Sequence, residues 1–191
     1  MVTKRRMGPR DSVTSIALLD ATERVLRNEG YGAASSRRVA EEAGLKQQLV
    51  YYYFHTMDEL LLATFRRRTA RALASLEKDI AGEKPVRALW ERLSSISGAK
   101  LAFEFMALAN HHEGIREEVA RFVTDSRRMV TGAIAQACER RQVDLGPVTP
   151  EALAFLFSNV TLMLGREGTT GIGEGHDETR KLVEWVLDRL D

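Results

Sequence analysis

Apolar residues recur every three or four positions along most of the chain, the spacing of one face of an α-helix. The first stripe consists of Leu18, Leu19, Thr22, Val25 and Leu26. It predicts a helix that begins at Asp11 or Ser12 and continues to about Glu29, where Gly30 ends it. We expect this helix to support two shorter helices that follow it.

The first short helix is predicted after Ser35 or Ser36, because either hydroxyl can accept a hydrogen bond from a free backbone N–H at a helix start. Its apolar stripe is Val39, Ala40 and Ala43. Gly44 follows at once, and glycine tolerates the left-handed conformation that ends many helices. Leu45 is then the apolar residue of a tight turn.

The second short helix is predicted over about residues 47–54, with Val50 and Phe54 on its inner side. The residues that point elsewhere are Lys46, Gln47, Gln48, Tyr51 and Tyr52. Two helices joined by a short turn with glycine, the second with a polar leading end, are typical of a helix-turn-helix.

The polar residues of this second helix suit DNA, because a recognition helix places its N-terminal residues against base edges in the major groove. Gln47 and Gln48 can each pair with the N6 and N7 edge of adenine, and Lys46 suits a guanine edge or a phosphate. Tyrosine hydroxyls can reach phosphates while the rings stay packed. Alternatively, the glutamines are only solvated and the tyrosines belong to the core.

Five stretches of this region stand in a specific order and spacing: Gly30-Tyr31, Ala34-Ser35, Val39-Ala40-Glu41-Glu42-Ala43-Gly44-Leu45, Val50-Tyr51-Tyr52-Tyr53-Phe54 and Asp58-Glu59-Leu60. Together they resemble the DNA-binding domain of TetR-type transcriptional regulators, over about the first third of the chain. The resemblance implies an all-α fold, with a three-helix head carrying the helix-turn-helix and a helical body for ligand binding and dimerisation. About nine helices are expected in all.

The resemblance also implies which residues contact DNA. The implied phosphate and base-reading positions are Ser36, Arg37, Lys46, Gln47, Gln48, Tyr51 and Tyr53, and Tyr52 of the same helix is added to them. Lys46 stands where the family often has a small capping residue. Met57 stands where the family often has a phosphate-binding lysine, so Thr56, His55 or a neighbouring backbone N–H is expected to replace that contact.

Basic residues gather near the N-terminus. Residues 1–56 contain nine Lys and Arg against six Asp and Glu, a balance of +3 that leaves −2 for the rest of a chain of net charge +1. Residues 1–10 hold Lys4, Arg5, Arg6 and Arg10 and no acid, which predicts a flexible arm. The arm is either a solvated tail or, through Arg5 and Arg6, a contact with DNA phosphates or the minor groove.

The remaining pattern predicts six further helices, over about residues 57–80, 85–97, 100–110, 115–141, 149–166 and 174–190. Three of the breaks between these helices are Gly98, a turn at residues 111–114 and a glycine-rich link at residues 165–175. The arginine cluster Arg66, Arg67, Arg68 and Arg71 is expected to be a solvated face. The helix over residues 149–166 is apolar nearly all round, so it needs cover on every side.

We expect the last two helices to supply that cover by pairing with those of a second copy, because two-fold self-pairing is the commonest solution. The resemblance implies the same homodimer. It also implies a cavity for a small apolar effector among the middle helices. The candidate lining residues are Trp90, Phe103, Met106, Phe122, Met129, Phe155, Asn159 and Met163, with His111 or His112 as a further polar group. The alternative for each of these residues is plain core.

Other functional classes find little support. Adjacent His111 and His112 cannot both face one metal as a helical pair four residues apart can, so we expect no metal, no cofactor and no catalytic residue. Cys138 is the only cysteine and is expected to be a small buried apolar residue. Residues 1–10 precede no secretory apolar stretch, and the longest apolar run is far too short to cross a membrane, so a cytoplasmic location is expected.

The sequence therefore predicts three parts: a basic arm (residues 1–10), a helix-turn-helix DNA-binding domain (residues 11–56) and a ligand-binding and dimerisation domain (residues 57–191). The predicted function is a homodimeric regulator, acting as a repressor, that binds a near-palindromic double-stranded DNA operator and is released by an apolar small molecule. The alternative is a DNA-binding protein of the same fold with a structural or cell-cycle role and no ligand gating.

Overall fold

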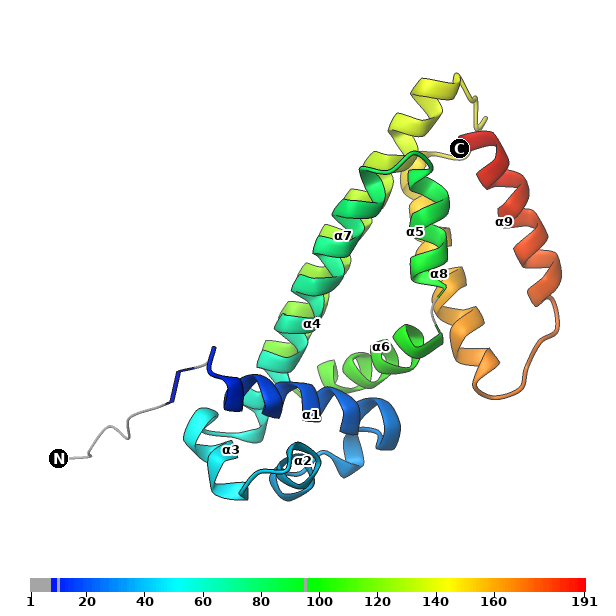
Figure 1. Ribbon diagram of the computed structural model, residues 1–191. Helices are drawn as coiled ribbons and strands as arrows, with labels where there is room; N and C mark the ends of the chain where they lie inside the picture. Colours follow the sequence, from blue (N-terminus) through cyan, green and yellow to red (C-terminus); the bar gives the residue numbers. More distant parts are fainter. Residues whose placement is uncertain (1–7, 10, 95) are drawn as a thin grey trace. The chain divides into compact units, whose positions relative to one another are not determined.

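The computed structural model describes residues 8–9, 11–94 and 96–191, and this part of the chain forms nine α-helices, one 3-10 helix and no strand (Figure 1). The helices fall into two compact units. The first comprises Met1–Thr69 and Glu104–Val119, and the second comprises Ala70–Phe103 and Ala120–Asp191. The all-α class expected from the sequence is confirmed.

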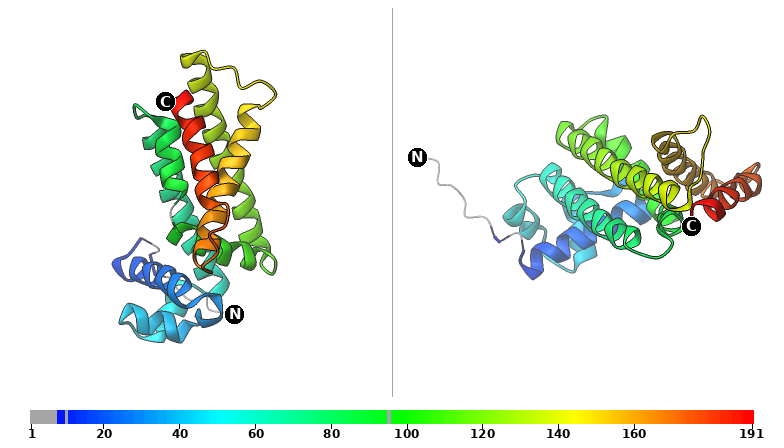
Figure 2. Two further views of the ribbon diagram at one scale, coloured as in Figure 1. Left: turned by 90° about the vertical axis from the view of Figure 1, so that its right-hand side faces the viewer. Right: turned by 90° about the horizontal axis from the view of Figure 1, so that it is seen from above.

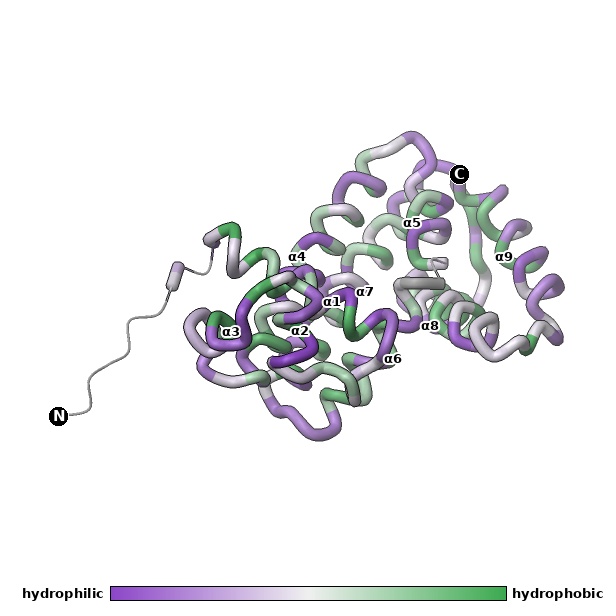
Figure 3. The backbone as a smooth tube through the Cα atoms, turned by 60° about the horizontal axis from the view of Figure 1, so that its bottom comes forward, coloured by the Kyte–Doolittle hydropathy of each residue, from purple (hydrophilic) through white to green (hydrophobic). Residues whose placement is uncertain are grey.

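Helix α1 (Val13–Glu29) begins and ends as predicted. The hydroxyl of Ser12 accepts a hydrogen bond from the N–H of Ser15 at 3.2 Å, and Gly30 ends the helix with φ of +82°. The whole predicted stripe of apolar residues is buried. A short 3-10 helix, η1 (Tyr31–Ala33), follows. Figure 3 shows hydrophilic and hydrophobic residues alternating along the helices.

Helices α2 (Ser36–Ala43) and α3 (Gln47–Tyr53) form the predicted helix-turn-helix. Ser35 caps α2, and Gly44 ends it in the left-handed conformation with φ of +66°. The side chains of Val50 and Phe54 are fully buried against α1 and α2 residues such as Leu18 and Val39. The head thus has a core of its own.

Helix α4 (Met57–Ile80) starts with a reciprocal cap. The Thr56 hydroxyl accepts from the N–H of Glu59 at 3.1 Å, and the Glu59 carboxylate accepts from the N–H of His55 at 3.0 Å. Later in the first unit, the rings of Phe65 and Phe105 pack with centroids 4.5 Å apart. Residues 104–119 therefore share an apolar contact with the part of α4 that follows the head.

The second unit packs α5 (Pro85–Leu93), α8 (Pro150–Gly168) and α9 (His176–Leu190) with parts of α4 and α7 (Glu113–Arg141) (Figure 2). The centroids of the Trp90 and Phe157 rings lie 5.4 Å apart in its core. Cys138 is partly buried against the same core, and this burial raises the pKa of its thiol. No helix in the described ranges is both long and apolar enough to cross a membrane.

Several predicted boundaries in the body are wrong. The break after α5 comes at Leu93 instead of about residue 97, and α6 (Ile96–Ala109) runs through Gly98. Helix α7 already begins at Glu113, α8 continues to Gly168, and α9 begins two residues later than expected. A glycine inside a helix costs only about 1 kcal/mol relative to alanine, which burial of neighbours such as Leu101 offsets.

Helix α5 is capped from a distance. Lys84, at its N-cap position, makes no side-chain cap hydrogen bond. Instead the Asp191 carboxylate accepts from the backbone N–H of Arg87 at 2.5 Å and from that of Val86 at 3.4 Å. A carboxylate at a helix N-terminus also interacts favourably with the helix dipole.

We predict that Asp191→Ala lowers the free energy of unfolding by about 1 kcal/mol, the usual cost of a lost N-cap. Asp191→Asn keeps an acceptor oxygen and should lose less. Urea unfolding followed by circular dichroism measures both variants. Equal stability of wild type and Asp191→Ala would contradict this role.

Candidate DNA-binding site

Helix α3 exposes a polar face because its apolar face is buried. Val50 is fully buried, whereas Tyr51 and Tyr52 beside it are 45% and 47% exposed. Lys46, Gln47 and Gln48 at the start of the helix are exposed as well. The residues that the sequence predicted as a reading surface thus lie together on the outside of the head.

Ser36, predicted as a DNA contact, has a different environment from the others. Its side chain is buried, and its hydroxyl accepts a hydrogen bond from Gln47 Nε2 at 2.8 Å and another from the Tyr51 hydroxyl at 3.0 Å. Arg37, the next residue, is exposed and forms an ion pair with Glu41 at 2.9 Å. Within the predicted set, Ser36 joins α2 to α3 and Arg37 faces solvent.

Tyr53 is half-buried and meets Tyr52 edge to face, with ring centroids 5.0 Å apart. Gly8, which no sequence pattern indicated, lies against both rings, and its N–H donates to the Tyr52 carbonyl at 3.4 Å. A Cβ atom at Gly8 would overlap these rings. Thr56 is exposed and caps α4, whereas Arg5 and Arg6 lie outside the described residues.

Charged side chains tie α1 to α2 behind this surface. Arg38 Nη2 lies 2.6 Å from Glu29 and 2.8 Å from Glu42, and Arg24 Nε lies 2.7 Å from Glu42. The hydrogen bonds from Arg24 and then Arg38 hold the pKa of Glu42 below its usual value. Those from Glu29 and Glu42 raise the pKa of Arg38. The network fixes how α2, and with it α3, is held on α1.

This head matches a known family. The model of bacterial regulatory proteins of the tetR family matches residues 18–64. A curated relative, the HTH-type nicotine-responsive transcriptional repressor HdnoR of Paenarthrobacter nicotinovorans, is 31% identical over 99 residues, which cover 51% of each chain. The chain spans about half the length of the curated relatives it matches.

Solved structures extend the likeness of fold beyond the head. A TetR family transcription regulator from Marinobacter aquaeolei superposes with a TM-score of 0.63 at 24% identity, covering 95% of this chain and 97% of that one. The regulator FadR of Bacillus subtilis, solved with stearoyl-CoA, gives a TM-score of 0.53 at 15% identity, with 81% and 88% covered. The head, residues 18–64, thus carries the DNA-binding domain of the tetR family, and the rest of the chain shares the fold of these solved structures.

Further contacts hold the head to α6 and to the turn that precedes α7, within the first unit. The N–H of Tyr31 donates to Glu104 at 2.9 Å, and its hydroxyl lies 3.4 Å from His112 Nε2. The other ring nitrogen of His112 lies 3.4 Å from Asp58. Tyr31 is 41% exposed, and these polar partners hold it at the surface.

The candidate ligand-binding residues of the body lie in different environments. Trp90 and Met129 pack into or against the core of the second unit, while Met106 and His111 are exposed in the first. Phe103 and Phe122 are half-buried. Asn159 donates to the carbonyl of Phe155 in its own helix at 2.8 Å.

Helices α8 and α9 expose large apolar side chains. These are Phe155, Leu156, Met163, Leu182 and Trp185, each between 47% and 62% exposed. The Arg127 guanidinium carbon lies 4.9 Å from the Phe155 ring centroid. Exposed apolar side chains of this size commonly mark an interaction surface.

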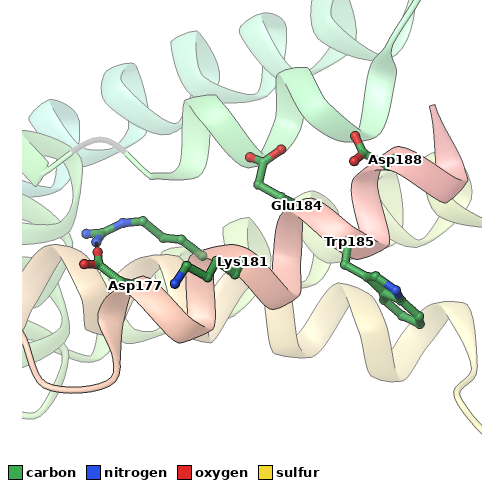
Figure 4. Close-up of a pocket in the computed structure, with 6 residues that line it drawn as sticks. Asp177, Lys181, Glu184, Trp185 and Asp188 are labelled. Carbon is green, nitrogen blue, oxygen red and sulfur yellow. Dashed lines mark hydrogen bonds and ion pairs between the residues drawn. The ribbon is translucent and has the colours of Figure 1, made fainter.

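An open hollow of about 530 Å³ runs along the charged side of α9. Figure 4 shows Glu184 and Asp188 pointing to one side of the helix and Trp185 to the other. Arg87 of α5 lies 2.6 Å from Glu184 and 2.8 Å from Asp188, so these two acids already have a cationic partner. No group of three or more His, Cys, Asp or Glu side chains in the described ranges is arranged to hold a metal ion.

We predict that Glu42→Gln makes the protein less stable to heat at neutral pH and that the difference from wild type shrinks on acidification. A carboxylate with a lowered pKa stabilises the fold above its usual pKa and loses this contribution as the pH falls through the lowered value. The measurement is the unfolding temperature of both proteins between pH 7 and pH 3, roughly the range in which carboxylates titrate.

The matched control is Glu41→Gln, on the same helix, whose partner Arg37 forms a single ion pair on the surface. It should change stability less than Glu42→Gln does, because isolated exposed pairs contribute little. Identical pH profiles for the two variants would contradict the role given to Glu42.

Proposed function

We propose that the protein is a homodimeric transcriptional regulator that represses by binding a near-palindromic DNA operator and is released by a small apolar effector. The observation that carries the proposal is the polar face of α3 held outward by a buried apolar face. Chromosomal DNA as the partner implies that the protein acts in the cytoplasm.

Reading of DNA is assigned to the start of α3. Lys46, Gln47 and Gln48 precede or open the helix and are exposed, as residues facing base edges in the major groove must be. Arg37 supplies a cation beside them for the phosphate backbone. Arg5 and Arg6 remain proposed phosphate or minor-groove contacts of the arm.

Dimerisation is assigned to α8 and α9. Leu182 and Trp185 of α9 are 62% and 55% exposed, and Phe155 and Leu156 of α8 are about half-exposed, which is costly for a lone chain in water. A second copy related by two-fold symmetry covers the same face on both partners. Two heads in such a dimer would read half-sites about 34–36 Å apart, one turn of B-DNA.

Effector binding is assigned to the body. One relative is named as nicotine-responsive and one structure of the same fold was solved with stearoyl-CoA, which supports a response to a small molecule. The contacts of Tyr31 with Glu104 and His112 give the head a link to α6 and to the turn that precedes α7. The effector can shift the head only by binding one conformation more tightly than the other.

A second candidate is a DNA-binding protein without ligand gating. It is favoured by the packing of Trp90 and Met129, two proposed cavity residues, against the core of the second unit. A small molecule carried through purification and detected by native mass spectrometry would support gating. A chain free of any ligand, with unchanged DNA binding across a library of apolar compounds, would support this second candidate.

We predict that Leu182→Glu shifts the protein from dimer towards a monomer of 21.4 kDa in sedimentation velocity, because a charge would be buried at the centre of the interface. Val13→Glu is the control, since Val13 is also exposed and apolar but lies at the start of α1. A wild-type chain that sediments as a monomer at micromolar concentration would contradict the dimer.

We predict that the protein selects a specific duplex from a random pool and that Gln47→Ala with Gln48→Ala weakens binding to it. The expected loss is about 1–3 kcal/mol for each bidentate base contact removed, with relaxed base preference. Fluorescence anisotropy measures both. Unaltered affinity and preference in the double variant would remove α3 from the reading role.

A further inference from the structure

The buried hydroxyl of Ser36 binds two side chains of the exposed face of α3, those of Gln47 and Tyr51. Ser36 is the first residue of α2, and its side chain is only 6% exposed. Gln47 Nε2 donates to its oxygen at 2.8 Å and the Tyr51 hydroxyl donates to it at 3.0 Å. Gln47 and Tyr51 are four residues apart, so they are neighbours on the same side of the helix.

These two hydrogen bonds fill the acceptor capacity of Ser36, because a hydroxyl oxygen has two lone pairs. We propose that Ser36 is a positioning residue for base reading. It orients Gln47 and Tyr51 as one unit and acts on DNA through them, and it does not itself bind phosphate. The inference rests on the proposed function of α3 in DNA binding.

Burial supports this division of roles. Ser36 is enclosed between α2 and α3, whereas the neighbouring Arg37 side chain is 81% exposed and cationic. Phosphate contacts come from groups that reach outward, so Arg37 and Lys46 suit that role better than Ser36 does.

The hydrogen bond to Ser36 also determines what Gln47 offers to a base. A carboxamide has two N–H donors and one carbonyl acceptor, and one N–H is committed to Ser36. One donor and one acceptor remain, which is the pattern that the N7 and N6 atoms of adenine require. Guanine presents two acceptors, N7 and O6, and would set one of them against the Gln47 carbonyl. Gln47 should therefore prefer adenine.

Gln48 provides a comparison within the same helix turn. No hydrogen bond to its side chain is present in the described part of the chain, and it is exposed. Its side chain must be ordered when DNA binds, whereas that of Gln47 is ordered beforehand, and ordering a long side chain lowers affinity. Gln47 should accordingly discriminate between bases more strongly than Gln48.

The test uses the full chain and a duplex that the wild type selects from a random pool. Ser36→Ala should weaken binding to this duplex by about 3- to 10-fold, the worth of one or two neutral hydrogen bonds, and leave binding to an unselected duplex unchanged. Ser36→Thr keeps the hydroxyl and should bind as the wild type does. Ser35→Ala removes the cap of α2 and should lower thermal stability without relaxing base preference.

A double-mutant cycle separates positioning from direct contact. Adding Ser36→Ala to a Gln47→Ala, Tyr51→Phe background should change affinity less than about twofold, because the residues through which Ser36 acts are gone. Replacing the selected adenine by guanine should lower the DNA affinity of the wild type by a larger factor than it lowers that of Ser36→Ala.

Three results would overturn the inference. A full effect of Ser36→Ala in the double-variant background would make Ser36 a direct DNA contact. Equal loss on selected and unselected duplexes would make it a backbone contact or a folding defect. A wild type that selects a duplex, with Ser36→Ala matching it in affinity and preference, would leave Ser36 without a role. Failure of the wild type to select any duplex would overturn the proposed function itself.

Discussion

Burial of one side of α3 is the constraint on which the head depends. The helix has seven residues, far fewer than an isolated helix needs to be stable in water. Val50 and the following Phe54 are fully buried among residues of α1 and α2, and this packing holds the helix in place. Because the apolar side is fixed inward, the amide and phenol groups of the other side are fixed outward. The candidate reading surface is thus a product of the core beneath it.

The sequence predicted those elements whose boundaries are set by local chemistry. Ser12 and Ser35 cap helices through their own hydroxyls, and Gly30 and Gly44 end helices with positive φ, so each boundary could be read from a few neighbouring residues. The start of α6 could not be predicted from neighbouring residues in this way. Gly98 is typical of a helix break, but α6 continues through it because its neighbours Ala99 and Leu101 are buried in the folded protein.

The site was predictable to the same extent. Helical periodicity places Gln47, Gln48 and Tyr51 outside, but it cannot show that Ser36, eleven residues before Gln47, lies beneath them. The approach of Gly8 to Tyr52 likewise depends on tertiary contact. In the body, the same apolar spacing describes a residue that lines a cavity and one that fills a core. For this reason the sequence alone left Trp90 as either a cavity residue or a core residue, and the structure places it in the core of the second unit.

The first unit is assembled from two separated stretches, Met1–Thr69 and Glu104–Val119. In this unit the ring of Phe65 packs against that of Phe105, and the backbone N–H of Tyr31 donates a hydrogen bond to Glu104. Anyone who grafts this reading head onto a foreign sensor for synthetic gene circuits therefore has to transplant both stretches together. A graft that ends at Thr69 without the second stretch would lack Phe105 and leave the Phe65 ring without this contact.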